Sequence, residues 1–172
     1  MATSSLAFQA VPDQMIRPAP FQELYQQYSN VVYLTALRVT GNAADAEDAL
    51  QTVFLRILKQ EERFEVAWSS AAYFRRAATN ASIDILRRRA WQAETPLDGI
   101  LPQLAEESPA LLKQRLRQAL SRLEPQDAEL FVLKYVEGFS GEELAEQFGI
   151  ERATVGSRLF RIRQTLREVI ER

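Results

Sequence analysis

The 172-residue sequence contains no cysteine and no histidine. Without cysteine there are no disulfide bonds and no thiolate chemistry, and without either residue type zinc fingers are excluded. The lack of histidine also removes imidazole metal ligands and the acid–base group of most hydrolase triads. We therefore expect no catalytic residue, no metal site and no cofactor.

Several other features are missing as well. Residues 1–20 lack the basic start and apolar core of an export signal, and no apolar run approaches the roughly 18 residues that a membrane helix needs. No glycine-rich phosphate-binding loop suggests nucleotide hydrolysis, so we do not expect an enzyme. These absences predict a cytoplasmic protein without membrane insertion.

What remains is patterned as helices, which predicts an all-α fold of two small helical domains joined by a flexible linker. Residues 1–20 form a tail, and residues 21–91 form a first domain of three or four helices. A helix from Phe21 ends at Gly41, a second begins after the potential cap Asn42, and a third runs from about Ser70 to Trp91.

Residues 92–112 are predicted to be the linker. This part of the chain is rich in proline and carries acidic residues without a basic one between Glu94 and Pro109. Residues 113–172 then form a second domain, in which Pro125, Gly138 and Gly149 separate four predicted helices.

Charge is distributed unevenly along the chain. The net charge is −2, yet residues 73–91 hold five arginines against one aspartate, and residues 152–167 hold five arginines and no acid. Two basic segments are thus separated by an acidic linker. Local charge of this kind governs contacts with polyanions more than the total does.

The first basic segment has two faces when drawn as a helix of about 100° per residue. One stripe is apolar and consists of Phe74, Ala78, Ala81 and Ile85. The other is polar with aromatic residues on the same line, and consists of Tyr73, Arg76, Asn80, Asp84, Arg87 and Trp91. Arginine attracts phosphate, asparagine can read a base edge, and aromatic rings stack on unpaired bases. The alternative is a solvated face whose charges pair along the helix.

The second basic segment has the spacing of a helix-turn-helix, with the turn at Gly149 and Ile150. Its second helix has an apolar seam consisting of Val155, Leu159, Ile162 and Leu166. Residues projecting outward, where a major groove would lie, are Thr154, Ser157, Arg158, Phe160 and Arg161. A helical hairpin that binds no DNA is the alternative.

Together these motifs resemble a known family. The sequence "DAEDALQTVFLRILK", then "AAYFRRAATNASIDILRRR", an acidic linker, and "LRQALSRLEPQDAELFVLKYVEGFSGEELAEQFGIERATVGSRLFRIRQTLR" are similar to the extracytoplasmic-function (ECF) sigma factors, the smallest sigma subunits of bacterial RNA polymerase. The resemblance runs from Phe21 to nearly the end of the chain. It implies sigma region 2 at residues 21–91 and sigma region 4 at residues 113–172.

The resemblance also implies partners and residue roles. Core RNA polymerase would be bound at its clamp helices by Asp45, Glu47, Asp48, Gln51, Phe54 and Leu55, and at its flap by region 4. The minus-ten promoter element would be recognised and melted by Tyr73, Arg76, Asn80, Asp84, Arg87 and Arg88, while the loop from Glu61 to Ser70 captures a flipped base. The minus-thirty-five element would be read by Arg152, Thr154, Ser157, Arg158, Phe160 and Arg161. An anti-sigma factor is an expected further partner.

One departure from the family pattern concerns the recognition helix. Position 156 is glycine, where the family often has lysine or arginine, and glycine lowers helix propensity by about 1 kcal/mol relative to alanine. Two other classes of protein stay open at this stage. A stand-alone helix-turn-helix regulator would bind duplex DNA without polymerase, and a helical protein-interaction module would show no salt-dependent DNA affinity.

Overall fold

A computed structural model describes residues 21–59, 70–94 and 108–170. The tail, the centre of the linker and the predicted base-capturing loop before Ser70 lie outside these ranges. Within them the chain forms seven α-helices and no strand, which confirms the all-α prediction. The helices are α1 (Phe21–Thr40), α2 (Ala43–Lys59), α3 (Ala71–Glu94), α4 (Pro109–Arg122), α5 (Pro125–Tyr135), α6 (Gly141–Phe148) and α7 (Arg152–Ile170).

Helix boundaries agree with the sequence expectations except at the linker. Helix α3 continues to Glu94, beyond the predicted end at Trp91, and α4 begins at Pro109, inside the segment assigned to the linker. Ser108 explains the earlier start of α4, because its hydroxyl accepts a hydrogen bond from the Leu111 amide at 3.2 Å. Proline in the first turn needs no amide partner there, so it favours this start.

Helices α1, α2 and α3 form a bundle around one apolar core. The stripe predicted from the spacing is buried at all four positions, Phe74, Ala78, Ala81 and Ile85. The Phe74 ring stacks on Tyr28 of α1, with 4.2 Å between ring centroids. Helix α2 begins at its expected cap, where the Asn42 side chain accepts from the Asp45 amide.

The helix-turn-helix forms as predicted, with local signals at both ends of α6. Ser140 and Glu143 make a reciprocal capping box at the start of this helix. Gly149 ends it with φ of +61°, a backbone conformation that residues with a Cβ atom rarely adopt. The turn allows α7 to pack its apolar seam against the rest of the second unit, and all four seam residues, Val155, Leu159, Ile162 and Leu166, are buried.

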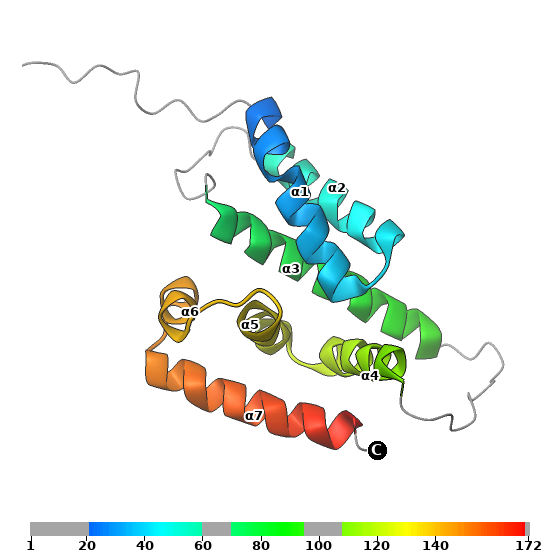
Figure 1. Ribbon diagram of the computed structural model, residues 1–172, viewed down its shortest axis with the longest axis vertical. Helices are drawn as coiled ribbons and strands as arrows, with labels where there is room; N and C mark the ends of the chain where they lie inside the picture. Colours follow the sequence, from blue (N-terminus) through cyan, green and yellow to red (C-terminus); the bar gives the residue numbers. More distant parts are fainter. Residues whose placement is uncertain (1–20, 60–69, 95–107, 171–172) are drawn as a thin grey trace, which may run out of the picture.

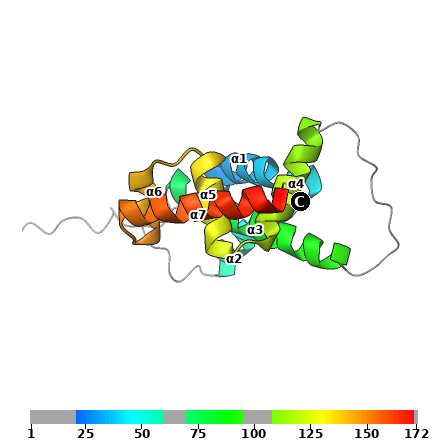
Figure 2. The ribbon, with the colours of Figure 1, turned by 90° about the horizontal axis from the view of Figure 1, so that it is seen from below.

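The two units pack against each other across α3. Figure 1 shows α1 and α2 on one side of α3, and α4 to α7 on the other. Val39 of α1 and Leu86 of α3 belong to the apolar cluster of the second unit. The view turned by 90° shows α7 running along the outer face of that unit (Figure 2).

The turn between α1 and α2 adds a polar anchor between the units. Arg117 of α4 donates to the Val39 carbonyl oxygen at 3.0 Å and lies over Gly41. A Cβ atom at Gly41 would come within 2.3 Å of the Arg117 guanidinium, and the φ of Gly41 is +69°. The positive φ of the turn favours glycine at this position, whereas the flexible Arg117 side chain would have to shift to admit a Cβ atom. None of the described helices is long and apolar enough to cross a membrane.

Candidate nucleic-acid interface

The outward face of α7 is the more accessible of the two candidate DNA-binding surfaces. Its buried seam turns the opposite side of the helix to solvent, and the exposed residues there include Thr154, Ser157 and Arg161. Phe160 is 53% exposed, as the spacing predicted. Polar donors, an arginine and an apolar ring thus share one face, and Arg152 starts the helix beside them. Such a face can contact base edges and phosphates in a major groove.

Arg158 differs from its neighbours on α7 because it is mostly buried. Its guanidinium donates twice to one carboxylate oxygen of Asp127 in α5, at 2.6 and 3.1 Å, and its side chain is 20% exposed. The contact holds α7 against α5. Arg161, one turn further along, is exposed. The two arginines therefore differ in how much of the side chain is open to a ligand.

The polar stripe of α3 is divided by the contact with the second unit. Its first half, with Tyr73, Arg76 and Asn80, is partly covered, whereas Asp84 and Arg87 in the second half are exposed, as is the neighbouring Arg88. Asp84 lies 3.6 Å from Arg56 of α2. Asp84 thus pairs with another helix, whereas one of the two interpretations of the sequence has it pair along α3 itself.

Glu129 of α5 binds the covered half of the stripe. Arg76 donates to its carboxylate at 2.5 Å, and the Asn80 side-chain amide donates to the same oxygen at 3.1 Å. Arg76 also donates to the Gln147 carbonyl oxygen near the end of α6, at 2.7 Å, and lies 4.8 Å from the centre of the Phe148 ring. Carbonyl groups at a helix end carry partial negative charge, so this position suits a cation.

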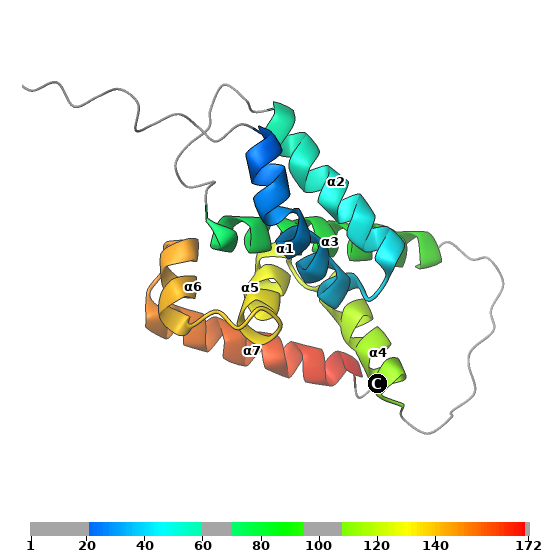
Figure 3. The same cartoon turned by 45° about the horizontal axis from the view of Figure 1, so that its top comes forward.

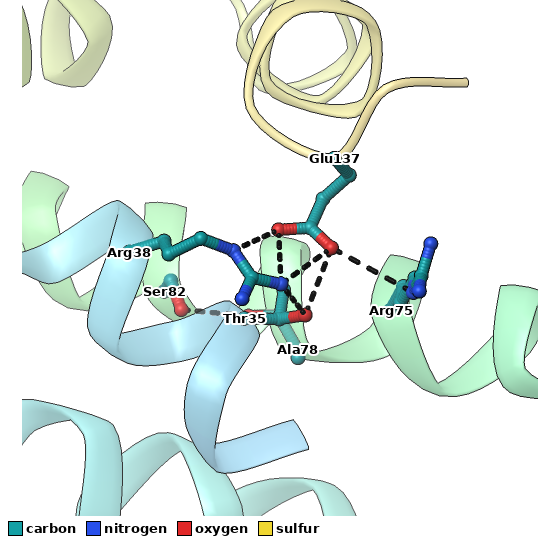
Figure 4. A network of polar contacts seen from close by, with 6 residues as sticks. All are labelled: Thr35, Arg38, Arg75, Ala78, Ser82 and Glu137. Carbon is teal, nitrogen blue, oxygen red and sulfur yellow. Dashed lines mark hydrogen bonds and ion pairs between the residues drawn. The ribbon is translucent and has the colours of Figure 1, made fainter. Parts of the chain in front are cut away.

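Glu137, in the turn after α5, is the centre of a second polar network (Figure 4). Its carboxylate accepts from the Arg38 guanidinium at 2.9 Å and from the Thr35 hydroxyl at 3.0 Å, both on α1. Arg75 of α3 lies 3.8 Å away on the other side. The Glu137 side chain is only 1% exposed. A carboxylate from the second unit is therefore enclosed by polar groups of the first.

A cleft of about 560 Å³ opens beside the covered half of the stripe. Tyr73 and Asn80 line it together with Arg56 of α2 and Gln147 of α6. Burial raises the pKa of the Tyr73 hydroxyl above its ordinary value of 10.0, and the nearby Arg56 offsets part of that rise. The hydroxyl consequently stays protonated near neutral pH and can donate a hydrogen bond.

The residues predicted to bind polymerase divide into a surface group and a buried group. Glu47, Asp48, Gln51 and Leu55 are exposed on α2, with Leu55 at 52%. Asp45 and Phe54 lie inside the bundle, at 4% and 3% exposure. Of the six predicted docking residues, four are thus open to a partner and two are packed inside the bundle.

Two segments of the chain match known family profiles. Residues 24–92 match the family profile described as Sigma-70 region 2, and residues 113–166 match the profile described as Sigma-70, region 4. These segments contain α3 with its stripe and the helix-turn-helix, in the order expected. The chain belongs to the sigma-70 family, in its ECF class.

Relatives cover nearly all of this ECF sigma factor. It is 31% identical to the ECF RNA polymerase sigma factor SigE of Mycolicibacterium smegmatis, over 98% of this chain and 68% of that one. It is 27% identical to the ECF RNA polymerase sigma factor SigW of Bacillus subtilis, over 86% of this chain and 87% of that one. These matches favour a sigma factor over a stand-alone regulator, because both regions are present in one chain.

A solved structure shares the fold. The sigma factor RpoE from Bartonella quintana, crystallised in complex with the anti-sigma factor NepR, aligns with a TM-score of 0.50 at 22% identity, over 88% of this chain and 96% of that one. The likeness supports the all-α architecture of the ECF sigma factor described above.

Glu129 and Glu137 are the residues that sequence reasoning missed. Both lie in the segment "DAELFVLKYVEG", whose spacing predicts a helix and no site. One signal was available, since Glu129 interrupts a run of apolar residues and shares the buried face with Ala128 and Leu130. A carboxylate on such a face requires a partner, but the neighbouring sequence does not identify which residue that partner is.

Proposed function

We propose that α7 of this ECF sigma factor reads the minus-thirty-five promoter element as duplex DNA, through Arg152, Thr154, Ser157, Phe160 and Arg161. The observation that carries this assignment is the exposure of these residues on one face of the second helix of a helix-turn-helix. Arg158 contributes in a different way, by holding α7 against α5 through Asp127.

Helix α3 is assigned to the minus-ten element. Asn80 has the paired donor and acceptor that identify a base, Tyr73 offers a ring for stacking, and Arg76, Arg87 and Arg88 attract phosphates. The assignment is supported by the cleft beside Tyr73 and Asn80, which provides room for an unpaired base. Promoter melting then uses binding free energy alone, and the protein acts as a specificity subunit without being an enzyme itself.

Core polymerase would dock on α2 through Glu47, Asp48, Gln51 and Leu55, and region 4 would contact its flap. Exposure of two acidic residues and of Leu55 on the same helix supports this surface. The protein would act in the cytoplasm, where the polymerase is. An anti-sigma factor is a further proposed partner, suggested by the NepR complex of the Bartonella relative.

Run-off transcription tests the function. Core RNA polymerase without sigma is combined with the protein and with a pool of upstream fragments from its own genome. We expect discrete transcripts whose start sites reveal the promoter sequence. Asn80→Ala should reduce duplex opening without reducing binding to core, and Arg161→Ala should weaken closed complexes at the minus-thirty-five element.

Arg167→Ala provides a matched control, because Arg167 is an exposed arginine on α7 beyond the predicted reading face. It should leave the transcript pattern unchanged. Absence of transcripts together with failure to co-elute with core would overturn the proposed function. Equal loss of core binding in the Asn80 and Arg161 variants would overturn the division of labour between α3 and α7.

A further inference from the structure

A second cleft, of about 560 Å³, opens between the two units. The end of α1, one face of α4 and the end of α5 meet around it (Figure 3). It shares no lining residue with the cleft beside Asn80, and its lining residues are not among those proposed to bind promoter DNA or to dock on polymerase through α2. Its volume lies within the range of about 300–1,000 Å³ that is typical of small-molecule sites, which are frequent where domains meet.

The floor and walls of this cleft are apolar. Val39 of α1, Leu120 of α4 and Val132 of α5 are buried, and Leu37 and Leu116 beside them are partly buried. The partly buried side chains still present apolar surface to water. A ligand body that covers them removes its own apolar surface from water together with theirs, which favours binding.

Two basic residues on one face of α4 border the apolar walls. Lys113 and Arg117 are four residues apart and therefore lie one helical turn from each other, with Leu116 and Leu120 on the same face. Lys113 is exposed, and no carboxylate of the described residues pairs with it. Arg117 donates to a neutral group, the carbonyl oxygen of Val39. Both side chains therefore keep a positive charge that a ligand can neutralise.

The charge of the cleft has a single sign, although the chain as a whole carries a net charge of −2. Its third charged residue is Arg38, which already pairs with Glu137 at 2.9 Å. Of the described residues that line the cleft, none has a carboxylate. A cation would find no counter-charge there, whereas an anion would find the side chains of Lys113 and Arg117. Positive charge beside an apolar floor suits a ligand with an anionic head and an apolar body.

We propose that this cleft binds a small amphipathic carboxylic acid. The carboxylate pairs with Lys113 and Arg117, as charge-assisted hydrogen bonds require. The apolar body covers Leu116, Leu120 and Val132. This inference is independent of the functions proposed for α3 and α7. Because the walls come from both units, the ligand binds them in their packed arrangement and stabilises the folded protein.

Calorimetric titration of the full-length protein with decanoate, kept below its critical micelle concentration, tests the site. We expect saturable binding of one molecule per chain. Decanol has the same apolar body without the charge and should bind about tenfold more weakly, because the hydrogen bonds to charged groups are lost. Hexanoate keeps the carboxylate but buries fewer methylene groups, so its affinity should also fall at least about tenfold. No binding of decanoate, or equal affinity for decanoate and decanol, would overturn the proposal.

A charge reversal at the edge of the cleft tests the role of α4. Lys113→Glu alters an exposed side chain and should weaken decanoate binding about tenfold without changing the affinity for decanol. Arg122→Glu is the matched control, since it makes the same charge change on the same helix at an exposed residue that does not line the cleft. Its affinity for decanoate should equal that of wild type. Equal effects of the two substitutions would show attraction by net charge alone and contradict the site.

The apolar wall is tested by Leu116→Gln. An amide on this wall should weaken the binding of decanoate and of decanol alike, because both cover the same surface. Circular dichroism establishes that the variant is folded. If the folded variant bound both molecules as wild type does, the apolar body would lie elsewhere.

Nuclear magnetic resonance locates the bound molecule. Titration of ¹⁵N-labelled protein with decanoate should shift amide signals at the ends of α1 and α5 and along α4, including those of Leu37, Leu116 and Val136. Shifts confined to α2 or α7 would place decanoate on another apolar surface. Shifts spread over all the helices would indicate detergent-like association. Either result would overturn the proposal.

Thermal unfolding provides a readout that needs no label. Decanoate at about ten times its dissociation constant should raise the melting temperature of wild type by a few degrees and that of Lys113→Glu by less. A lowered melting temperature would show that decanoate prefers the unfolded chain and would contradict the site. None of these measurements contains DNA or polymerase, so their outcome does not depend on whether the promoter functions of α3 and α7 are correct.

Discussion

Arg89, near the end of α3, forms an ion pair with the buried carboxylate of Asp45 at the start of α2, with 2.7 Å between nitrogen and oxygen. The Asp45 side chain is 5% exposed, whereas that of Arg89 is 53% exposed. The pair fastens the beginning of one helix to the end of another. Arg89, which lies in the basic segment of α3, therefore has a structural role in holding the two helices together.

Arg89→Ala should therefore destabilise the protein. The substitution leaves the Asp45 carboxylate buried without its cation. We expect the free energy of unfolding to fall by about 1–2 kcal/mol, a range that already allows for the screening of the exposed arginine by solvent. Urea unfolding followed by circular dichroism measures the change. Arg88→Ala is the control and should leave stability within about 0.5 kcal/mol of wild type, because Arg88 is exposed.

Gly156→Ala should stabilise α7. Position 156 is helical, and a Cβ atom built there meets nothing within 4 Å, so alanine gains helix propensity without a clash. The expected gain is about 1 kcal/mol in the free energy of unfolding. The matched substitution Gly149→Ala should lower it by about 1 kcal/mol, since alanine is strained at a φ of +61°. If both substitutions changed the free energy of unfolding in the same direction, the backbone conformations assigned to the two glycines would be contradicted.

Glu143 should make the helix-turn-helix sensitive to acid. The Ser140 backbone amide, which donates to this carboxylate, lowers the pKa of Glu143 below its ordinary value of 4.5. A lowered folded-state pKa gives stability that is present above the ordinary pKa and is lost as pH falls through the folded pKa. Wild type should melt above Glu143→Gln at neutral pH, and the two melting temperatures should converge as the pH falls through the lowered pKa of Glu143. If the difference between the two melting temperatures stayed constant down to strongly acidic pH, the lowered pKa of Glu143 would be excluded as its cause.

Leu55→Asp should abolish co-elution with core polymerase. Leu55 is 52% exposed on α2 beside Gln51, so the substitution alters the surface without opening the core. Leu34→Asp is a matched control, because Leu34 is 40% exposed on α1. Co-elution of the Leu55 variant at wild-type levels would place the docking surface elsewhere. Circular dichroism should show unchanged helix content in both variants.

Two arginines on α7 should separate stability from DNA binding. Arg158→Ala removes the two hydrogen bonds to Asp127 and should lower the melting temperature by several degrees, with a smaller direct effect on base contacts. Arg161→Ala should leave the melting temperature unchanged and weaken binding of the minus-thirty-five duplex by about tenfold. Differential scanning fluorimetry and fluorescence anisotropy, measured on both variants, distinguish the two roles.

The sequence predicted the helices and the sides that they bury with few errors. The apolar stripe of α3 and the seam of α7 are buried at every predicted position, because burial on a single helix follows from periodicity. The boundary of α4 was predicted too late. Its segment was assigned to the linker by proline content, although Ser108 and Pro109 together form a helix start.

Site residues were harder to place than helices. Asp45 and Phe54 were grouped with Glu47, Asp48 and Leu55 as docking residues, yet the first two are buried and the others exposed. A motif identifies residue types that occur together along the chain. It does not separate those that touch a partner from those that hold the helix in position, because that distinction depends on which neighbouring helix covers each side chain.

By itself the sequence determined the helical fold, the helix-turn-helix and the family to which the chain belongs. These depend on local spacing, capping residues and charge, which act within a few turns of one helix. Only the tertiary structure decided that Glu129 and Glu137 close over α3. That contact joins residues about 50 to 100 positions apart, and whether a buried carboxylate meets an arginine depends on how the two units pack, which no single segment encodes.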